Sequence, residues 1–368
     1  MIKVLSIVGA RPQLMKAAVL SKAFKTSKHF FEILIHTGQH FDDNMSSSLI
    51  SELFDKKPDY QLGSGGKSEI TMLAELIVNL AEIIAKERPD YVISYGDTTT
   101  TLAGALASRK LNVKHVHVEA GVRNFDMHMP EEVNRVIVDR ISDLNFCATQ
   151  KCLENLRSEG YERVLNPYGS IFSGDLMFEC FVEIASRVAR DQTILQSIVS
   201  PDSNYVYVTL HRQSNVDVEV KLKEIVAALN EINDEIPVVM PLHPRTKKML
   251  REFNLSFSFK TIPPVSYFES IGMIQGCEYV ITDSGGLVRE AFFAKKNSLF
   301  LLEDHVWPEI EKLGFSVAVS KITRGAIVAQ YDKCKGLLGD FEVPIFGDGK
   351  TSSYMLSSIE SHFKNLTA

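Results

Sequence analysis

The 368-residue sequence contains few cysteines, and their positions argue against two kinds of site. They are scattered along the chain, and none has the paired spacing of a zinc site or of a redox CxxC motif. We therefore expect no bound metal. We also expect reduced thiols in a cytoplasmic protein, because disulfides persist mainly in oxidising compartments. The five cysteines are Cys147, Cys152, Cys180, Cys277 and Cys334.

The sequence also lacks a long apolar run and a strong charge of one sign. No run reaches the roughly 20 residues of a membrane-spanning helix, and the apolar residues 1–8 are too few for a signal peptide. The net charge of -6, from 40 basic and 46 acidic residues, predicts no nucleic-acid-binding surface. We expect a soluble protein without membrane or nucleic-acid partners, in which local clusters of Arg, Lys and His hold any anionic ligand.

Two common nucleotide-binding motifs are missing as well. Neither half of the chain has GxGxxG after its first strand, and there is no GxxxxGK[ST] loop. Bound NAD and ATP usually depend on these motifs. We therefore expect a protein that works without a cofactor.

Predicted strands and helices alternate throughout the chain, which is typical of a parallel sheet with helices on both faces. The alternation pauses at residues 166–175, a turn-rich stretch that we take as the domain boundary. We expect an α/β fold of two Rossmann-like, doubly wound domains. Residues 1–170 form the first domain, which a C-terminal helix (350–368) joins, and residues 171–349 form the second.

Charged residues are concentrated between Val116 and Arg135, in the sequence VHVEAGVRNFDMHMPEEVNR. We expect a strand to end at Glu119 and a helix to start at Pro130, whose fixed φ suits the first helical position. Glu131 lies four residues before Arg135, so the two share one helix face. A capped helix with a surface ion pair would explain these charges. Carboxylates beside arginines at the end of a strand nevertheless favour a catalytic site.

Asp97 lies at another such position, directly after the predicted strand 91–94 and before a helix. Asp at this point most often caps the helix. Its position at the end of a strand also matches that of Glu119, which favours catalysis equally.

Two turns before helices are candidate anion sites, because N–H groups at a helix N-terminus attract phosphate. The first turn, residues 9–13, precedes a helix predicted over residues 14–25, and Arg11 and Lys16 reinforce it. The second turn is the better phosphate site, because it combines two glycines with a serine hydroxyl. It contains Ser284, Gly285 and Gly286.

Taken in order, these motifs resemble the non-hydrolysing UDP-N-acetylglucosamine 2-epimerase family over nearly the full chain. The matching segments are residues 9–13 (GARPQ), 96–98 (GDT), 119–123 (EAGVR), 130–135 (PEEVNR), 211–215 (HRQSN), 243–244 (HP), 282–286 (TDSGG) and 347–349 (GDG). The resemblance implies a glycosyltransferase-B-like fold with UDP in the cleft between the domains. It also implies a homodimer.

The family's chemistry implies a role for each motif. Elimination of UDP from carbon 1 gives a 2-acetamidoglucal, and re-addition with protonation on the other face gives the epimer. By this match Asp97, Glu119 and Glu131 supply the acid–base groups, and His211 is a further catalytic residue. His243 is considered equally as a ligand-binding and as a structural residue. The expected UDP-binding residues are Arg11, Lys16, Arg135, Ser284, Gly285, Gly286 and Glu290, with Glu290 accepting from the ribose hydroxyls.

Departures from the family pattern bear on the substrate. Residues 39–45 (QHFDDNM) differ from the sequence of members that UDP-N-acetylglucosamine regulates, and Ser270 stands where an aromatic residue is usual. Glu303 replaces an expected arginine. Ala10, Gln13 and the DDNM segment resemble the branch that acts on UDP-2,3-diacetamido-2,3-dideoxyglucuronate.

Three other functions share parts of this pattern. A glycosyltransferase would share the fold and the Ser-Gly-Gly turn, but it would not need three carboxylates in the first domain. A hydrolysing epimerase would release free sugar, but the GTRAEYG-like start of that group is absent. A non-enzymatic nucleotide-sugar sensor would not need clustered acid–base residues.

Overall fold

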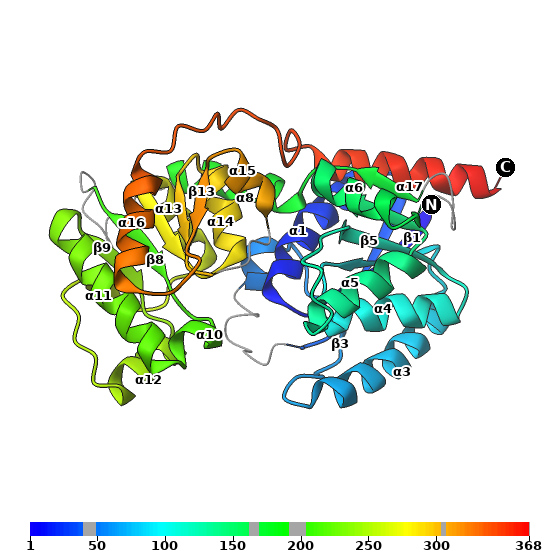
Figure 1. Ribbon diagram of the computed structural model, residues 1–368. Helices are drawn as coiled ribbons and strands as arrows, with labels where there is room; N and C mark the ends of the chain where they lie inside the picture. The colour runs from blue at the N-terminus through cyan, green and yellow to red at the C-terminus, as the bar shows by residue number, and fades with distance from the viewer. Residues whose placement is uncertain (40–48, 162–168, 191–203, 303–306, 368) are drawn as a thin grey trace. The chain divides into compact units, whose positions relative to one another are not determined.

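A computed structural model describes most of the chain, which divides into two compact units (Figure 1). The first unit comprises Met1–Cys180 and Pro344–Ala368, and the second comprises Phe181–Val343. Each unit contains one parallel sheet, which confirms the predicted class of two doubly wound α/β domains. The described residues are 1–39, 49–161, 169–190, 204–302 and 307–367.

The sheet of the first unit has seven strands, and its strand order reverses between β1 and β4. The central strands β1 and β4 are nearly continuous buried runs, as expected for a parallel sheet covered on both faces. In spatial order they are β3 (Tyr60–Gln61), β2 (Phe30–His36), β1 (Ile2–Val8), β4 (Tyr91–Tyr95), β5 (Lys114–Ala120), β6 (Leu144–Cys147) and β7 (Ser170–Phe172).

Helices cover both faces of this sheet. On one face α4 packs between α3 and α5, and on the other α1 packs against α17 (Figure 1). The hydroxyl of Tyr91 lies 2.7 Å from Nδ1 of His362, which ties the C-terminal helix to β4. The helices are α1 (Arg11–Thr26), α3 (Glu69–Glu87), α4 (Thr99–Lys110), α5 (Pro130–Ile141), α6 (Gln150–Ser158) and α17 (Thr351–Thr367).

The sheet of the second unit has six strands in the order 3-2-1-4-5-6, with the reversal between β8 and β11. The strands are β10 (Lys260–Ile262), β9 (Val238–Pro241), β8 (Val206–Thr209), β11 (Tyr279–Thr282), β12 (Ser298–Phe300) and β13 (Ser316–Ala318). Residues of α11 and α16 form a core cluster on one face, and residues of α13 and α14 form another.

The remaining helices belong mostly to the second unit. They are α8 (Leu176–Arg190), α10 (Gln213–Val216), α11 (Glu219–Glu235), α12 (Pro244–Glu252), α13 (Tyr267–Gly276), α14 (Gly285–Phe293), α15 (Pro308–Lys312) and α16 (Arg324–Lys335). All five cysteines are free and buried.

Two predicted boundaries were wrong. The first helix begins at Arg11 rather than at residue 14, because Pro12 suits the first helical turn and the side chain of Gln13 accepts from the N–H of Ala10. Ser170–Phe172, inside the stretch predicted as turns, pairs with β6 as a seventh strand.

We expect Gly121→Ala to lower the free energy of unfolding by more than about 2 kcal/mol. Gly121 has a φ of +77°, which costs an L-residue about 1–2 kcal/mol, and a Cβ there would overlap the carbonyl of Cys152. Gly160→Ala is the matched control, because Gly160 has the same φ but a Cβ there would have no described neighbour within 4 Å. Urea denaturation measures both losses, and equal losses would contradict the predicted clash.

Candidate active site

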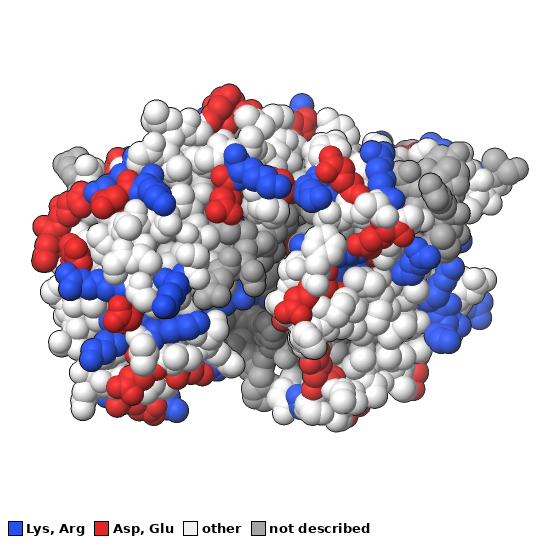
Figure 2. Space-filling model, in the orientation of Figure 1, with Lys and Arg blue, Asp and Glu red and all other residues white. Residues whose placement is uncertain are grey.

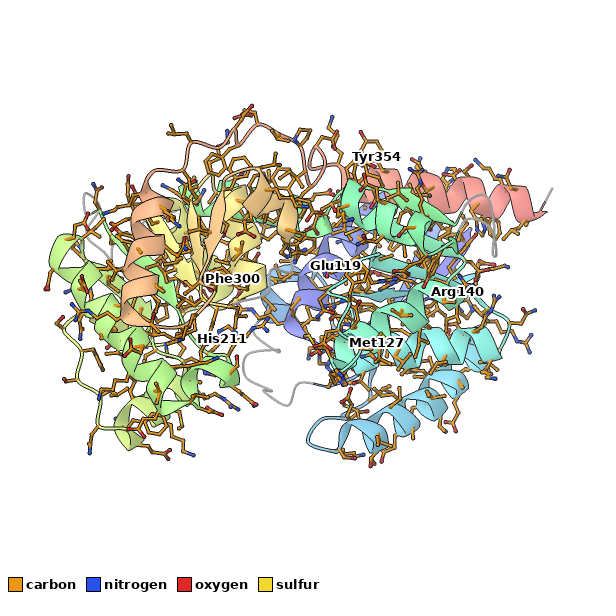
Figure 3. The ribbon with its side chains drawn as sticks, viewed as in Figure 1. Glu119, Met127, Arg140, His211, Phe300 and Tyr354 are labelled. Carbon is orange, nitrogen blue, oxygen red and sulfur yellow. The ribbon has the colours of Figure 1, made fainter. Side chains whose placement is uncertain are left out.

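The sheet topology brings three predicted residues to neighbouring strand ends in the first unit. Strand β1 pairs with β4, and β4 pairs with β5, so their carboxyl ends lie side by side. Lys16 lies in α1 after β1, and Asp97 follows β4. Glu119 lies at the end of β5 (Figure 3). This edge, where the strand order reverses, is where open α/β sheets bind ligands.

Glu119 is held by a buried lysine. Its Oε2 lies 2.6 Å from Nζ of Lys16, and their side chains are 14% and 3% exposed. A Cβ on Gly96 would lie 3.8 Å from both charged groups, so the pair lies beside the turn that carries Asp97. Glu119 also has a φ of +73°, a strained conformation that costs about 1–3 kcal/mol and is typical of functional sites.

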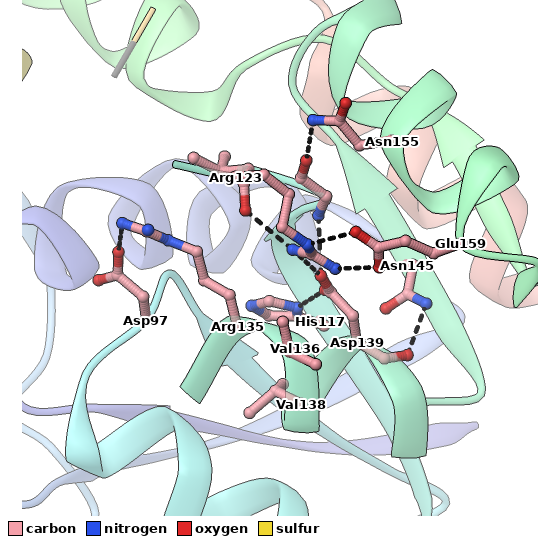
Figure 4. Close-up of polar contacts among 12 residues, drawn as sticks. Asp97, His117, Arg123, Arg135, Val136, Val138, Asp139, Asn145, Asn155 and Glu159 are labelled. Carbon is pink, nitrogen blue, oxygen red and sulfur yellow. Dashed lines mark hydrogen bonds and ion pairs between the residues drawn. The ribbon is translucent and has the colours of Figure 1, made fainter. Parts of the chain in front are cut away.

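Asp97 is held by Arg135 and does not cap a helix. The N-cap of α4 is Thr98, whereas the carboxylate of Asp97 pairs with the guanidinium of Arg135 (Figure 4). The backbone carbonyl of Asp97 accepts from the amide of Asn134 at 2.8 Å. The capping role considered from the sequence is therefore wrong, and α5 positions Asp97.

Arg135 pairs with a different glutamate from the one expected. Its second contact is with Oε2 of Glu132 at 2.9 Å, and the side chain of Glu132 is only 1% exposed. Glu132 also accepts from the N–H of Phe125 at 3.0 Å. Glu131 is exposed, and the described residues offer it no hydrogen bond or ion pair. The ion pair considered between Glu131 and Arg135 is thus replaced by a pair between Glu132 and Arg135, three residues apart.

A buried network that the sequence analysis missed lies beside these residues (Figure 4). Asp139 contacts Nδ1 of His117 at 2.6 Å and accepts from Arg123 at 2.7 Å and from the N–H of Gly121 at 3.1 Å. Arg123 also donates twice to Glu159. Among the described residues Arg123 thus pairs with Asp139 and Glu159 and with none of the three predicted acid–base carboxylates. The alternation of His115, His117 and Glu119 along β5 was the available signal.

Gln13 connects the turns after β1 and β4. Its side-chain oxygen accepts from the N–H groups of Gly9 and Ala10 at 2.7 and 3.0 Å. Its side-chain nitrogen donates to the carbonyl of Tyr95 at 2.7 Å, a contact that a glutamate could not make. This substitution in the family motif therefore has a structural role.

In the second unit, Asp283 organises His211, whose position Figure 3 shows. The two residues follow neighbouring strands, β8 and β11. Asp283 is fully buried, accepts from the backbone N–H groups of His211 and Arg212, and lies 3.1 Å from Nδ1 of His211. The side chain of His211 is 43% exposed, so it is oriented but accessible. Asp283 had no predicted role, although it lies in the TDSGG segment.

His243 has the structural role that we considered. It is the N-cap of α12, and its Nδ1 accepts from the N–H of Arg245 at 3.2 Å. Its ring centroid lies 5.8 Å from that of His211. Burial lowers the pKa of His243, and the charges of His211 and Arg245 lower it further, so the ring is neutral near pH 7.

The Ser-Gly-Gly turn forms the start of α14, as predicted. Ser284 is its N-cap and accepts from the N–H of Leu287 at 3.4 Å. Gly285 and Gly286 form the first turn, and Glu290 lies in the same helix with 6% of its surface exposed.

Other residues singled out in the sequence lie elsewhere in the fold or outside the described ranges. Arg11 is half-buried at the start of α1. Ser270 is buried and lies 3.0 Å from the hydroxyl of Tyr207, which occupies the space beside it. Residues 40–45 of the QHFDDNM segment and Glu303 are outside the described part of the chain.

Acidic and basic side chains are interspersed on the face shown in Figure 2, as the small net charge suggests. No helix within the described ranges is long and apolar enough to cross a bilayer. Among the same residues, no group of three His, Cys, Asp or Glu side chains is arranged to hold a metal.

Sequence comparison identifies the family. A family model described as UDP-N-acetylglucosamine 2-epimerase matches residues 22–360. The chain belongs to this family. It is 41% identical over 352 residues to the UDP-2,3-diacetamido-2,3-dideoxy-D-glucuronate 2-epimerase of Pseudomonas aeruginosa, across 95% of this chain and 97% of that protein. The chain is thus an isomerase of the epimerase family.

Solved structures agree with this family. The crystal structure of Methanocaldococcus jannaschii UDP-GlcNAc 2-epimerase in complex with UDP-GlcNAc and UDP matches with a TM-score of 0.88 and 30% identity, over 98% of this chain and 100% of that one. A glycosyltransferase of Rickettsia africae matches over 99% of both chains with a TM-score of 0.59 at 15% identity, which shows the fold alone. These matches confirm the predicted glycosyltransferase-B-like class, and the family match decides against a glycosyltransferase.

We expect Arg135→Gln to lower the free energy of unfolding by about 3 kcal/mol or more. The substitution leaves Glu132 as a buried charge without its cation, which is a costly change. Arg140→Gln is the control on the same helix, because Arg140 is exposed and stacks over the ring of Tyr161. Thermal and urea denaturation measure both variants. A loss for Arg135→Gln no larger than that of the control would contradict this account of the pair.

Proposed function

We propose that this isomerase is a non-hydrolysing 2-epimerase of a UDP-2-acetamido sugar. One observation carries the proposal: Asp97 and Glu119 lie at neighbouring strand ends, and each is paired with a cation. Arg135 pairs with Asp97, and Lys16 pairs with Glu119. The reaction is an anti elimination of UDP to a glycal, followed by re-addition. It needs no redox step, which agrees with the missing nicotinamide and ATP motifs.

The chemistry accounts for the residue types. No carbonyl acidifies the hydrogen on carbon 2, so the departure of UDP first builds positive charge at carbon 1 and makes that hydrogen removable. A base and an acid are then required, and Asp97, Glu119 and Glu131 are the proposed groups. Lys16 and Arg135 pair with two of these carboxylates and hold them in place. Glu131, exposed at the start of α5, is accessible to a substrate.

The second unit supplies the proposed diphosphate and ribose contacts. Ser284, Gly285 and Gly286 present N–H groups at the N-terminus of α14, where a phosphate is favoured. Glu290 is proposed to accept from the ribose hydroxyls, and His211, oriented by Asp283, is the fourth catalytic residue. The first unit is proposed to contribute Arg11, Lys16 and Arg135, and His243 is a further candidate for UDP contact.

The Pseudomonas aeruginosa relative favours a diacetamido-uronate substrate over UDP-N-acetylglucosamine. Incubation with each sugar nucleotide, followed by product analysis by NMR, separates the two. We also propose a cytoplasmic homodimer that serves polysaccharide biosynthesis. The family resemblance supports the dimer, and the five free cysteines support a reducing compartment. Sedimentation equilibrium measures the assembly state.

Epimerisation in deuterium oxide should place deuterium on carbon 2 of both recovered substrate and product. The hydrogen removed there is replaced from solvent when the glycal is protonated. No added metal or nicotinamide should be needed. NMR and mass spectrometry of the recovered sugars measure the incorporation. Activity that EDTA abolishes and zinc restores would overturn this mechanism.

Asp97→Asn, Glu119→Gln and Glu131→Gln should each lower kcat by about 10²-fold or more, the effect of losing a general acid or base. Affinity for UDP, measured by calorimetry, should hold or improve because a negative charge is removed. Glu154→Gln is the control, since Glu154 is an exposed carboxylate on α6. Near wild-type turnover in all three variants would mean that the carboxylates are structural.

A further inference from the structure

Two buried histidines on β5 are bonded in opposite ways. His115 and His117 are adjacent on the same face of the strand, and both side chains are inaccessible to solvent. Each ring has a hydrogen-bond partner at both nitrogens. The chemical nature of those partners decides how many protons each ring carries.

His115 is a neutral ring. The hydroxyl of Ser142 donates to the carbonyl of Val138 at 2.7 Å, so it accepts from Nδ1 of His115, also at 2.7 Å. The hydroxyl of Ser94, 2.9 Å away, can then donate to Nε2. Burial lowers the pKa of His115 well below its ordinary value, and the neighbouring His117 lowers it further. One serine hydroxyl thus accepts the single ring proton of His115, and the other donates to the unprotonated nitrogen.

His117 faces two acceptors. Its Nε2 lies 2.7 Å from the carbonyl oxygen of Gly96, which can only accept, so Nε2 carries a proton. Its Nδ1 lies 2.6 Å from Oδ1 of Asp139. The other oxygen of Asp139 accepts from Arg123 and from the N–H of Gly121, which favours the ionised carboxylate. The proton between the two residues therefore rests on Nδ1.

The charges around His117 agree with a ring that is protonated at both nitrogens. Arg123 adds one positive charge and Glu159 one negative charge, so with His117 and Asp139 the cluster is neutral. Burial raises the pKa of the Cys147 thiol well above its usual range and that of Tyr161 to about 12, so both nearby groups are uncharged. The pKa of Asp139 is lowered, because His117 and Arg123 together outweigh the opposing effect of burial.

We propose that His117 is a buried imidazolium that acts as a positioning residue for both Asp97 and Glu119. The Gly96 carbonyl that it binds belongs to the peptide unit leading into Asp97. Asp139 contacts the chain on both sides of Glu119. It pairs with His117, two residues before Glu119, and accepts from the N–H of Gly121, two residues after it. These two contacts therefore restrain the left-handed backbone conformation of Glu119. This inference rests on the proposed function, for which it adds a residue outside the family-matched site.

Neutron diffraction from wild-type crystals at pH 8 tests the protonation directly and needs no substrate or variant. We expect deuterium on both ring nitrogens of His117 and on one nitrogen of His115 in the same crystal. A single deuterium on His117 would overturn the proposal. This result is independent of whether the wild-type protein epimerises a UDP-sugar, so failure here and failure of the proposed function are distinguishable.

Kinetics test the positioning role. His117→Gln should lower kcat by at least about 10-fold, because small displacements of catalytic groups are costly, while the Kd for UDP stays near the wild-type value. His115→Gln is the matched control from the same strand, and it should keep kcat even where its melting temperature falls by a similar amount. If His117→Gln folds and retains wild-type kcat, the positioning role is excluded. If it does not fold, the neutron result still decides the charge.

Discussion

A single buried carboxylate, that of Asp139, holds the chain on both sides of Glu119 in the first unit. It contacts donors on His117, Gly121 and Arg123, which lie on both sides of Glu119 in the chain. A buried charge is tolerated only when its hydrogen-bonding capacity is filled by cations and N–H groups. Asp139 lies in α5, and its partners His117 and Gly121 lie in β5 and directly after it, so these contacts join α5 to the end of β5. The geometry of Glu119 therefore depends on a residue 20 positions away in the sequence.

The second unit repeats this arrangement with different residues. Asp283 is fully buried after β11, and it orients His211 at the end of β8 through the backbone and the ring. In the second unit the histidine and the aspartate follow β8 and β11, the two strands between which the strand order reverses, whereas in the first unit they lie on β5 and α5. Both histidines are thus fixed by buried carboxylates, although His117 is inaccessible and His211 is open to solvent.

The charged residues of the first unit satisfy one another before any ligand binds. Lys16 pairs with Glu119, and Arg135 pairs with both Asp97 and Glu132. A diphosphate would bring further negative charge towards these cations, so their interactions would be shared between ligand and carboxylates. Glu131 differs because no described residue restrains its side chain. The three proposed acid–base groups therefore have different electrostatic environments before a ligand binds.

The sequence by itself determined the fold class, because apolar strands and amphipathic helices are encoded by local periodicity. It also determined which strand ends carry Asp97, Glu119, His211 and Ser284, since those residues directly follow or end apolar runs. Only the tertiary structure decided which charges pair. Arg135 is equally able to reach Glu131 or Glu132 from its own helix, and the burial of Glu132 and the approach of Asp97 from another strand select the second. The roles of His117, Asp139 and Asp283 were likewise inaccessible, because hydrogen bonds between residues 22 or 72 positions apart depend on sheet order rather than on local sequence.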